Sequence, residues 1–348
     1  MTTPRQQWSM AAAIVAIPTL ALTMGALSAN QPIGVLLAMA EPLLFATLMT
    51  VVAVTLLHLR HGMAAVILTS AVVGTVALHL PTEHHQPTGD GPQWLRVLRG
   101  CALLSKPAKA PVRLLTWTID DSVGVEQSME RFLELQPDII VINGTDDPAV
   151  GSRLGAALNG EVKFFPSDST AGGMTAVVRG SFQYCGGDDD HWTMPLPSAQ
   201  NGGGQGLITF PHVQDVGVFP LIITRLDTPS GINDWMEWGH HVISGAKDIA
   251  DAASVIGTRK MVLMGDLQIP ARSAPLATSI GKTGLRPIHS EPNWPTQVLG
   301  APFLPLHARD QAWVGSGWHV QAARVLPSEG QIRAPIVFDL VPDTSKAP

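Results

Sequence analysis

Acidic and histidine clusters are the first candidates for chemistry in this sequence, and two of them lack the spacing of a metal site. Residues 188–191 read Asp-Asp-Asp-His between glycine-rich stretches, without the ligand spacing of an EF-hand loop, which favours a solvated loop. His240 and His241 are adjacent, and adjacent residues of a helix point in different directions. They therefore do not form the pair four positions apart that binds zinc.

The composition excludes several classes of protein. The chain has 348 residues with a formal net charge of -6, which argues against a globally basic nucleic-acid binder. Only 14% of the residues are charged, below the value of about 25% that is typical of soluble domains. Two cysteines, Cys101 and Cys185, exclude a disulfide-dense scaffold and a four-cysteine zinc site. The sequence leaves open whether these two thiols pair.

Charged residues are scarcest in the first eighty residues, which we interpret as a membrane segment. Between residues 9 and 80 the only formal charges are Glu41 and Arg60. A bilayer core needs about 20 apolar residues per helix, and three spans fit, at residues 10–29, 42–59 and 63–80. A cleaved signal peptide is the alternative for the first span, although two further spans follow it.

Basic residues predict how these spans are oriented. Arg5 precedes the first span and Arg60 lies between the second and third, whereas the intervening loop at Asn30 and Gln31 carries no positive charge. The positive-inside rule therefore places the N-terminus in the cytoplasm and the chain after Leu80 outside it. We expect a multi-pass membrane protein whose C-terminal domain lies outside the cytoplasm.

After a linker at residues 81–111, rich in proline and glycine, the pattern becomes that of an α/β domain at residues 112–348. Helical patterns cover Val125–Leu135 and Trp235–Ile256. Short apolar runs of strand length lie at Val112–Thr118, Ile139–Ile142, Thr175–Val178, Leu207–Phe210, Leu221–Thr224, Met261–Met264, Gln311–Val314 and Pro335–Leu340.

Seven segments in this order carry a resemblance to a known family. They are Arg113–Ile119, Gln136–Gly144, Gly172–Val178, Ile223–Pro229, Met261–Gln268, Glu291–Pro295 with Leu304–Asp310, and Gln331–Ile336. Their order resembles the endonuclease/exonuclease/phosphatase superfamily, the fold of exonuclease III and DNase I. More narrowly, it resembles the bacterial branch with three N-terminal membrane helices, which implies a bacterial inner-membrane protein with a periplasmic C-terminal domain. The resemblance implies a four-layer αββα sandwich of two mixed β-sheets.

The resemblance also implies a site for phosphoester hydrolysis, of which this chain keeps little. In active relatives a Glu holds Mg²⁺, an Asp–Asn pair activates water, and two His with a supporting Asp stabilise the phosphoryl oxygens. Asp266 and Asp310 match retained catalytic positions. The other matching positions are substituted: Thr118 and Gln268 stand for Asn, Gly144 for the metal-binding Glu, Arg225 for His, and Ile332-Arg333 for Asp-His.

Three functions remain open from these residues. The leading hypothesis is a catalytically impaired protein with a binding or scaffolding role at the lipid bilayer. The alternative is an active Mg²⁺-dependent hydrolase whose ligands are relocated to loop acids, with candidates at Asp120, Asp121, Asp146 and Asp147. The third is a transporter or assembly subunit that works through its membrane helices.

The two arginines allow two interpretations of their own. Arg225 and Arg333 are suited to bidentate binding of a phosphate-like anion, which predicts a phosphate-containing small molecule as ligand. The other interpretation is that Arg225 or Arg333 pairs internally with Asp266 or Asp310 and fills a disused site. Nucleic acid is disfavoured as a partner by the overall charge, and the sequence points to no protein partner.

Overall fold

The computed structural model describes eleven stretches of the C-terminal part of the chain. They are residues 110–119, 123–145, 147–165, 173–183, 193–195, 204–226, 235–269, 271, 273–288, 310–327 and 333–343. No helix in these stretches is both long and apolar enough to cross a bilayer. The three predicted membrane spans and the linker lie outside the described residues, as do Cys101, Cys185, Asp120, Asp121, Asp146 and Ile332.

The first sheet has six strands, in the order β13-β14-β1-β2-β4-β3. Its only parallel pair is β1 with β2, in a register that places Thr118 beside Asn143, and the other pairs are antiparallel. The strands are β1 (Val112–Thr118), β2 (Ile139–Asn143), β3 (Glu161–Phe165), β4 (Met174–Val178), β13 (Trp318–Val325) and β14 (Ile336–Pro342).

The second sheet repeats this plan, with the path β11-β12-β10-β9-β7-β5. Here β9 and β10 form the parallel pair, and β6 and β8 pair with β7 off the main path. The strands are β5 (Gly180–Gln183), β6 (Thr193–Pro195), β7 (Gly204–Val213), β8 (Gly217–Val218), β9 (Leu221–Leu226), β10 (Val262–Asp266), β11 (Arg286–Pro287) and β12 (Asp310–Val314).

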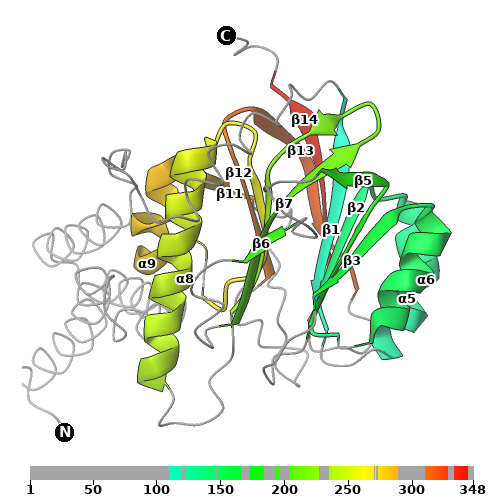
Figure 1. The fold of residues 1–348 in the computed structure, drawn as a ribbon, viewed down its shortest axis with the longest axis horizontal. Helices are drawn as coiled ribbons and strands as arrows, with labels where there is room; N and C mark the ends of the chain where they lie inside the picture. Colours follow the sequence, from blue (N-terminus) through cyan, green and yellow to red (C-terminus); the bar gives the residue numbers. More distant parts are fainter. Residues whose placement is uncertain are drawn as a thin grey trace, which may run out of the picture.

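Helices cover the outer face of each sheet, which gives four layers (Figure 1). The helices α5 (Val123–Leu135) and α6 (Pro148–Leu158) pack on the first sheet. On the second sheet lie α8 (Trp235–Ile256), α9 (Ala274–Thr278) and a short 3-10 turn at Gly281–Thr283. The predicted fold class, two mixed sheets packed as an α/β sandwich, is confirmed for the described part of the chain.

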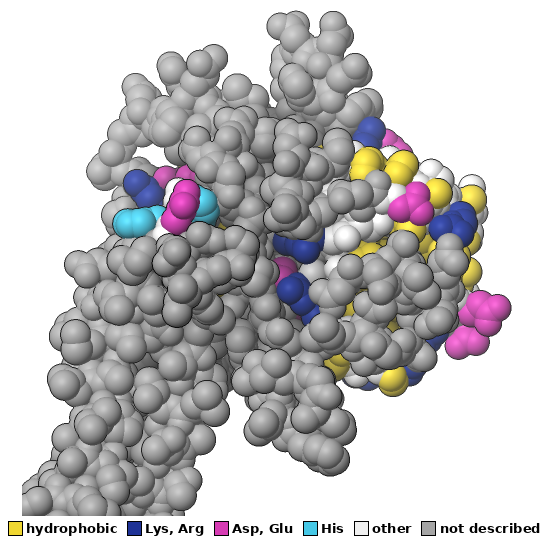
Figure 2. All heavy atoms as spheres, turned by 90° about the horizontal axis from the view of Figure 1, so that it is seen from below, with side chains coloured by type: hydrophobic (Ala, Val, Ile, Leu, Met, Phe, Trp, Pro, Cys, Tyr) yellow, Lys and Arg dark blue, Asp and Glu magenta, His cyan; other side chains and the backbone are white. Residues whose placement is uncertain are grey.

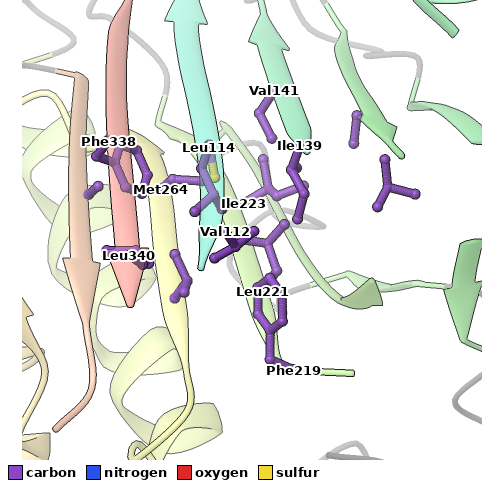
Figure 3. Packing of buried hydrophobic residues seen from close by; sticks show 14 of the residues in the cluster. Val112, Leu114, Ile139, Val141, Phe219, Leu221, Ile223, Met264, Phe338 and Leu340 are labelled. Carbon is purple, nitrogen blue, oxygen red and sulfur yellow. The ribbon is translucent and has the colours of Figure 1, made fainter. Parts of the chain in front are cut away.

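Strand alternation divides the core into an inner and two outer layers. Successive side chains of a strand point to opposite faces, so Val112 and Leu114 of β1 pack between the sheets while Leu115 and Trp117 pack under the helices. Figure 3 shows the inner layer, where side chains from both sheets interdigitate. The same alternation decides which polar residues at the strand ends face the space between the sheets.

The helix α6 was not predicted, and two glycines explain how closely it packs. Asp147 caps its N-terminus by accepting from the Ala149 amide, and Pro148 opens its first turn. A Cβ atom on Gly151 would lie 2.6 Å from Thr175 Cγ2, and one on Gly155 would lie 2.1 Å from Val162 Cγ2. The glycines therefore let the helix backbone rest directly on the first sheet.

An ionic cluster lies at the end of the first sheet where β1 begins. Arg113 pairs with Asp339 across β1 and β14, with an Nε–Oδ1 distance of 2.6 Å and an Nη2–Oδ2 distance of 3.0 Å. The Arg113 amide donates to Asp138 Oδ2 at 2.8 Å. Burial raises the pKa of Asp138, although this hydrogen bond and the charges of Arg179 and Arg113 oppose the shift.

We predict that Asp138→Asn becomes progressively more stabilising, relative to the parent, as pH rises. A carboxyl whose pKa is raised on folding contributes stability below its unfolded pKa, and that contribution is lost as pH rises through the folded pKa. The asparagine does not titrate, and its Oδ1 can still accept from the Arg113 amide. Urea unfolding of both proteins from acidic to neutral pH measures this; a constant difference between their unfolding free energies would contradict it.

Candidate functional site

Three charged residues lie side by side across the second sheet, at the end where β9 and β10 finish. The register pairs Asp266 of β10 with Arg225 of β9 on one side and with Asp310 of β12 on the other. Each lies two positions from an inner-layer residue (Ile223, Met264 or Ala312), so all three belong to the face between the sheets. Asp266 and Asp310 are fully buried, whereas Arg225 is partly exposed.

A row of uncharged polar residues faces these charges from the first sheet. Thr118 closes β1 and Asn143 closes β2, and both are completely buried. The Thr118 hydroxyl donates to Asp310 Oδ1, and Asn143 Nδ2 lies 3.4 Å from Thr118 Oγ1. The hydrogen bond between Thr118 and Asp310 joins the two sheets.

The carboxylate of Asp266 is engaged on both of its oxygens. Its Oδ1 accepts from the Gln268 amide at 3.0 Å, and its Oδ2 accepts from Gln268 Nε2 at 2.7 Å and from Arg333 Nη1. Gln268 also donates to the Leu226 carbonyl at 2.8 Å and has a positive φ of 65°. The ion pair is deeply buried, with side-chain exposures of 7% for Arg333 and 0% for Asp266.

Arg333 reaches Asp266 from the first sheet, because its backbone is held there. The indole Nε1 of Trp117 donates to the Arg333 carbonyl at 2.9 Å. Trp117 itself packs edge-to-face on Phe132 of α5, with ring centroids 5.5 Å apart. The Arg333 side chain thus forms a second polar link between the sheets, beside the one from Thr118 to Asp310.

The space next to Gly144 is filled by the guanidinium group of Arg225. A Cβ atom on Gly144 would lie 2.7 Å from Arg225 Nη1 and 3.3 Å from its Cζ. Gly144 has a φ of 95°, a conformation that side chains disfavour, and the same Cβ would lie 2.2 Å from the Ile119 carbonyl. Any larger residue at this position would have to displace both groups.

The described residues do not fit a magnesium site of the kind that the resemblance implies. Gly144 provides no ligand, and the oxygens of Asp266 are occupied by Arg333 and Gln268. Among the residues that the structure describes, no group of three or more His, Cys, Asp or Glu side chains could hold a metal ion. Of the four loop acids proposed as relocated ligands, only Asp147 is described, and its carboxylate caps α6.

The site end of the sandwich carries charges of both signs on its surface. Figure 2 shows this end, with Lys or Arg side chains beside Asp or Glu side chains near the middle of the face. Of the two arginines predicted to bind an anion, Arg333 instead forms an internal ion pair with Asp266, which was the second interpretation of the sequence. Anion binding by Arg225 stays a prediction.

Asn143 and Trp117 also belong to this site, although neither was among the candidate site residues predicted from the sequence. Asn143 ends the apolar run Ile-Ile-Val-Ile with a polar residue, which is a usable signal because the strand is otherwise wholly apolar. Trp117 acts through its indole N–H on a residue 216 positions away, and no local pattern encodes that contact. Gln311, next to Asp310 on β12, donates to the Ile269 carbonyl and accepts from the Trp313 indole N–H.

Comparison with known proteins supports the fold and goes no further. No protein-family model matches the chain, and no curated protein matches it in sequence. Among solved structures, a humanized D. rerio TDP2 with 14 mutations is 11% identical over 66% of this chain and 99% of its own, with a TM-score of 0.50. D. rerio TDP2 complexed with a single-strand DNA product is 10% identical over the same shares, also at 0.50.

Two further solved structures are similar at lower TM-scores. An endonuclease/exonuclease/phosphatase from Beutenbergia cavernae is 18% identical over 67% of this chain and 72% of its own, with a TM-score of 0.47. The 3'-5' exonuclease NExo from Neisseria meningitidis is 17% identical over 66% and 99%, also at 0.47. At such identities a likeness shows a shared fold and not a shared activity. By the two structures with a TM-score of 0.50, the described part of this chain shares the fold of D. rerio TDP2.

Proposed function

We propose that this chain is a membrane-anchored protein of the endonuclease/exonuclease/phosphatase fold, catalytically impaired, with a binding or scaffolding role. The observation that carries the proposal is the state of Asp266. This retained acid is completely buried, forms an ion pair with Arg333, and accepts two hydrogen bonds from Gln268. A buried carboxylate that is already bound to a guanidinium group and to two amide groups is poorly placed to bind a metal ion or to activate water.

The substituted neighbours of Asp266 support the same proposal. Arginine stays protonated near neutral pH, so neither Arg225 nor Arg333 can act as a general base. Thr118 is a donor to Asp310, which places this second retained acid in a structural contact as well. Arg225 is the partly exposed cation of the cluster, and we propose that it contacts a phosphate-like anion of the ligand.

The proposal predicts that the full-length protein, purified in detergent, does not hydrolyse a generic phosphodiester in the presence of Mg²⁺. Release of nitrophenol from bis(p-nitrophenyl) phosphate should equal the rate without protein, and Asp266→Asn should leave it unchanged. Melting curves of both proteins verify that they are folded. Magnesium-dependent hydrolysis that Asp266→Asn abolishes would establish the alternative, an active hydrolase with rearranged ligands, which the retention of two adjacent buried carboxylates favours.

The anion and membrane parts of the proposal are tested separately. Inorganic phosphate should raise the melting temperature of the parent and of Arg153→Gln, an exposed arginine of α6, but not of Arg225→Gln. An equal response in all three proteins would remove the anion from the proposal.

For the membrane anchor, we expect the protein to stay in the membrane fraction after carbonate washing and to be released by detergent. Release by carbonate would contradict a membrane-spanning segment.

A further inference from the structure

The buried charges at the site end of the sandwich need a cation to be stable. Asp266 and Asp310 are adjacent across β10 and β12, face the same side, and are completely buried. Two carboxylates in such a setting repel one another, and an uncompensated buried charge is costly. In a metal site of this kind a divalent cation would compensate them.

Two arginines bring positive charge to the same place from different parts of the chain. Arg333 binds the Asp266 carboxylate directly, and its backbone carbonyl is held by Trp117. Arg225 lies next to Asp266 in the register of β9 and β10, on the same face. This end of the sandwich therefore combines two buried carboxylates with two guanidinium groups, and the formal charges of these four groups balance.

Gly144 makes room for one of these guanidinium groups. The Arg225 guanidinium lies within contact distance of the position that a Cβ on Gly144 would take, 2.7 Å from Nη1. An acidic side chain at residue 144 and Arg225 in its present conformation would occupy the same space. Arg225 can therefore keep this conformation only while residue 144 is a glycine.

We propose that the guanidinium groups of Arg225 and Arg333 together replace a divalent cation in this protein. They balance the negative charges of Asp266 and Asp310, and through Arg333 they hold the two sheets together at this end without metal. The inference rests on the impaired site proposed above but concerns stability, so the two can fail separately. Magnesium-dependent stabilisation without hydrolysis would contradict this inference alone.

Chemical rescue of the full-length protein in detergent tests the replacement. Arg333→Ala removes a guanidinium group from beside Asp266, so its melting temperature should fall well below that of the parent. Millimolar methylguanidinium should then raise it again, because the ion fits the vacated space and restores the counter-charge. The parent and Arg153→Ala, which lacks an exposed arginine on α6, should show no such rise.

A metal titration and a milder variant complete the experiment. The melting temperature of the parent should be the same with EDTA and with millimolar Mg²⁺ or Mn²⁺. Should Arg333→Ala fail to fold, Arg225→Ala, at a partly exposed position, provides the same rescue assay. A parent that melts lower in EDTA and recovers with Mg²⁺ would overturn the proposal, as would folded arginine variants that methylguanidinium does not stabilise.

Discussion

Replacing Asp266 with alanine is expected to destabilise the folded protein by about 3–5 kcal/mol, the usual cost of removing one partner of a buried ion pair. The substitution leaves the Arg333 guanidinium buried at 7% exposure without its carboxylate, and Gln268 loses the acceptor of its backbone amide and one acceptor of its side chain. For a domain of this size the melting temperature should fall by roughly 6–20 °C. Thermal unfolding followed by circular dichroism measures the shift.

Two variants serve as controls for this result. Asp266→Asn keeps an oxygen that can accept from Gln268 and Arg333, so we expect a smaller loss than for alanine. Glu134→Ala removes an exposed carboxylate of α5 and should change stability by no more than about 0.5 kcal/mol. If Asp266→Ala were as harmless as Glu134→Ala, the carboxylate would not be a structural ion-pair partner, and a site kept open for catalysis would become the better explanation.

The second large effect is expected for Trp117→Ala, at about 3–5 kcal/mol. The indole ring is completely buried between β1 and α5, packs edge-to-face on Phe132, and donates to the Arg333 carbonyl. Alanine removes the packing and the hydrogen bond together. Urea unfolding of the variant and the parent measures the loss.

A phenylalanine variant separates the two contributions of Trp117. Trp117→Phe retains most of the ring packing but leaves the buried Arg333 carbonyl without its donor, at a cost of about 1–3 kcal/mol. Because that carbonyl fixes where the Arg333 side chain begins, Trp117→Phe and Arg333→Gln should be non-additive in a double-mutant cycle. Strict additivity would show that the indole does not position the arginine.

The sequence predicted the elements whose pattern is local and strong. The run Val112–Thr118 and the helix Trp235–Ile256 appear with the predicted bounds, because an uninterrupted apolar run and a long helical period leave little alternative. The β7 strand is longer than its predicted run and begins at Gly204. Its first residues are Gly-Gln-Gly, which carry no strand signal and are ordered by pairing with β9.

Elements that depend on tertiary contacts were missed. α6 contains Gly151 and Gly155, which weaken helix propensity, and it is stabilised where they rest on the first sheet. β13 has a weak apolar alternation because it is an edge strand with a register shift between Val320 and Ala322. For such segments the deciding energy lies in neighbours that are distant along the chain.

The location of the candidate site was predictable, and so was the pairing of an arginine with a retained acid, but the exact partners were not. The motif order placed Thr118, Gly144, Arg225, Asp266 and Arg333 at corresponding strand ends, and the structure brings them to one end of the sandwich. The choice of partners depends on side-chain reach between two sheets. That Thr118 bonds Asp310 while Arg333 bonds Asp266 follows from a geometry that motif matching does not contain.

The position of β14 has a consequence for biosynthesis. This strand lies inside the first sheet, between β13 and β1, and the Arg113–Asp339 pair that fastens it to β1 joins residues 226 positions apart. During translation, the edge of β1 that pairs with β14 therefore stays unpaired until residues 336–342 have left the ribosome. The nascent chain therefore exposes an aggregation-prone strand edge while most of the domain is being synthesised. A premature stop codon upstream of β14 would leave β1 without its neighbour on that side.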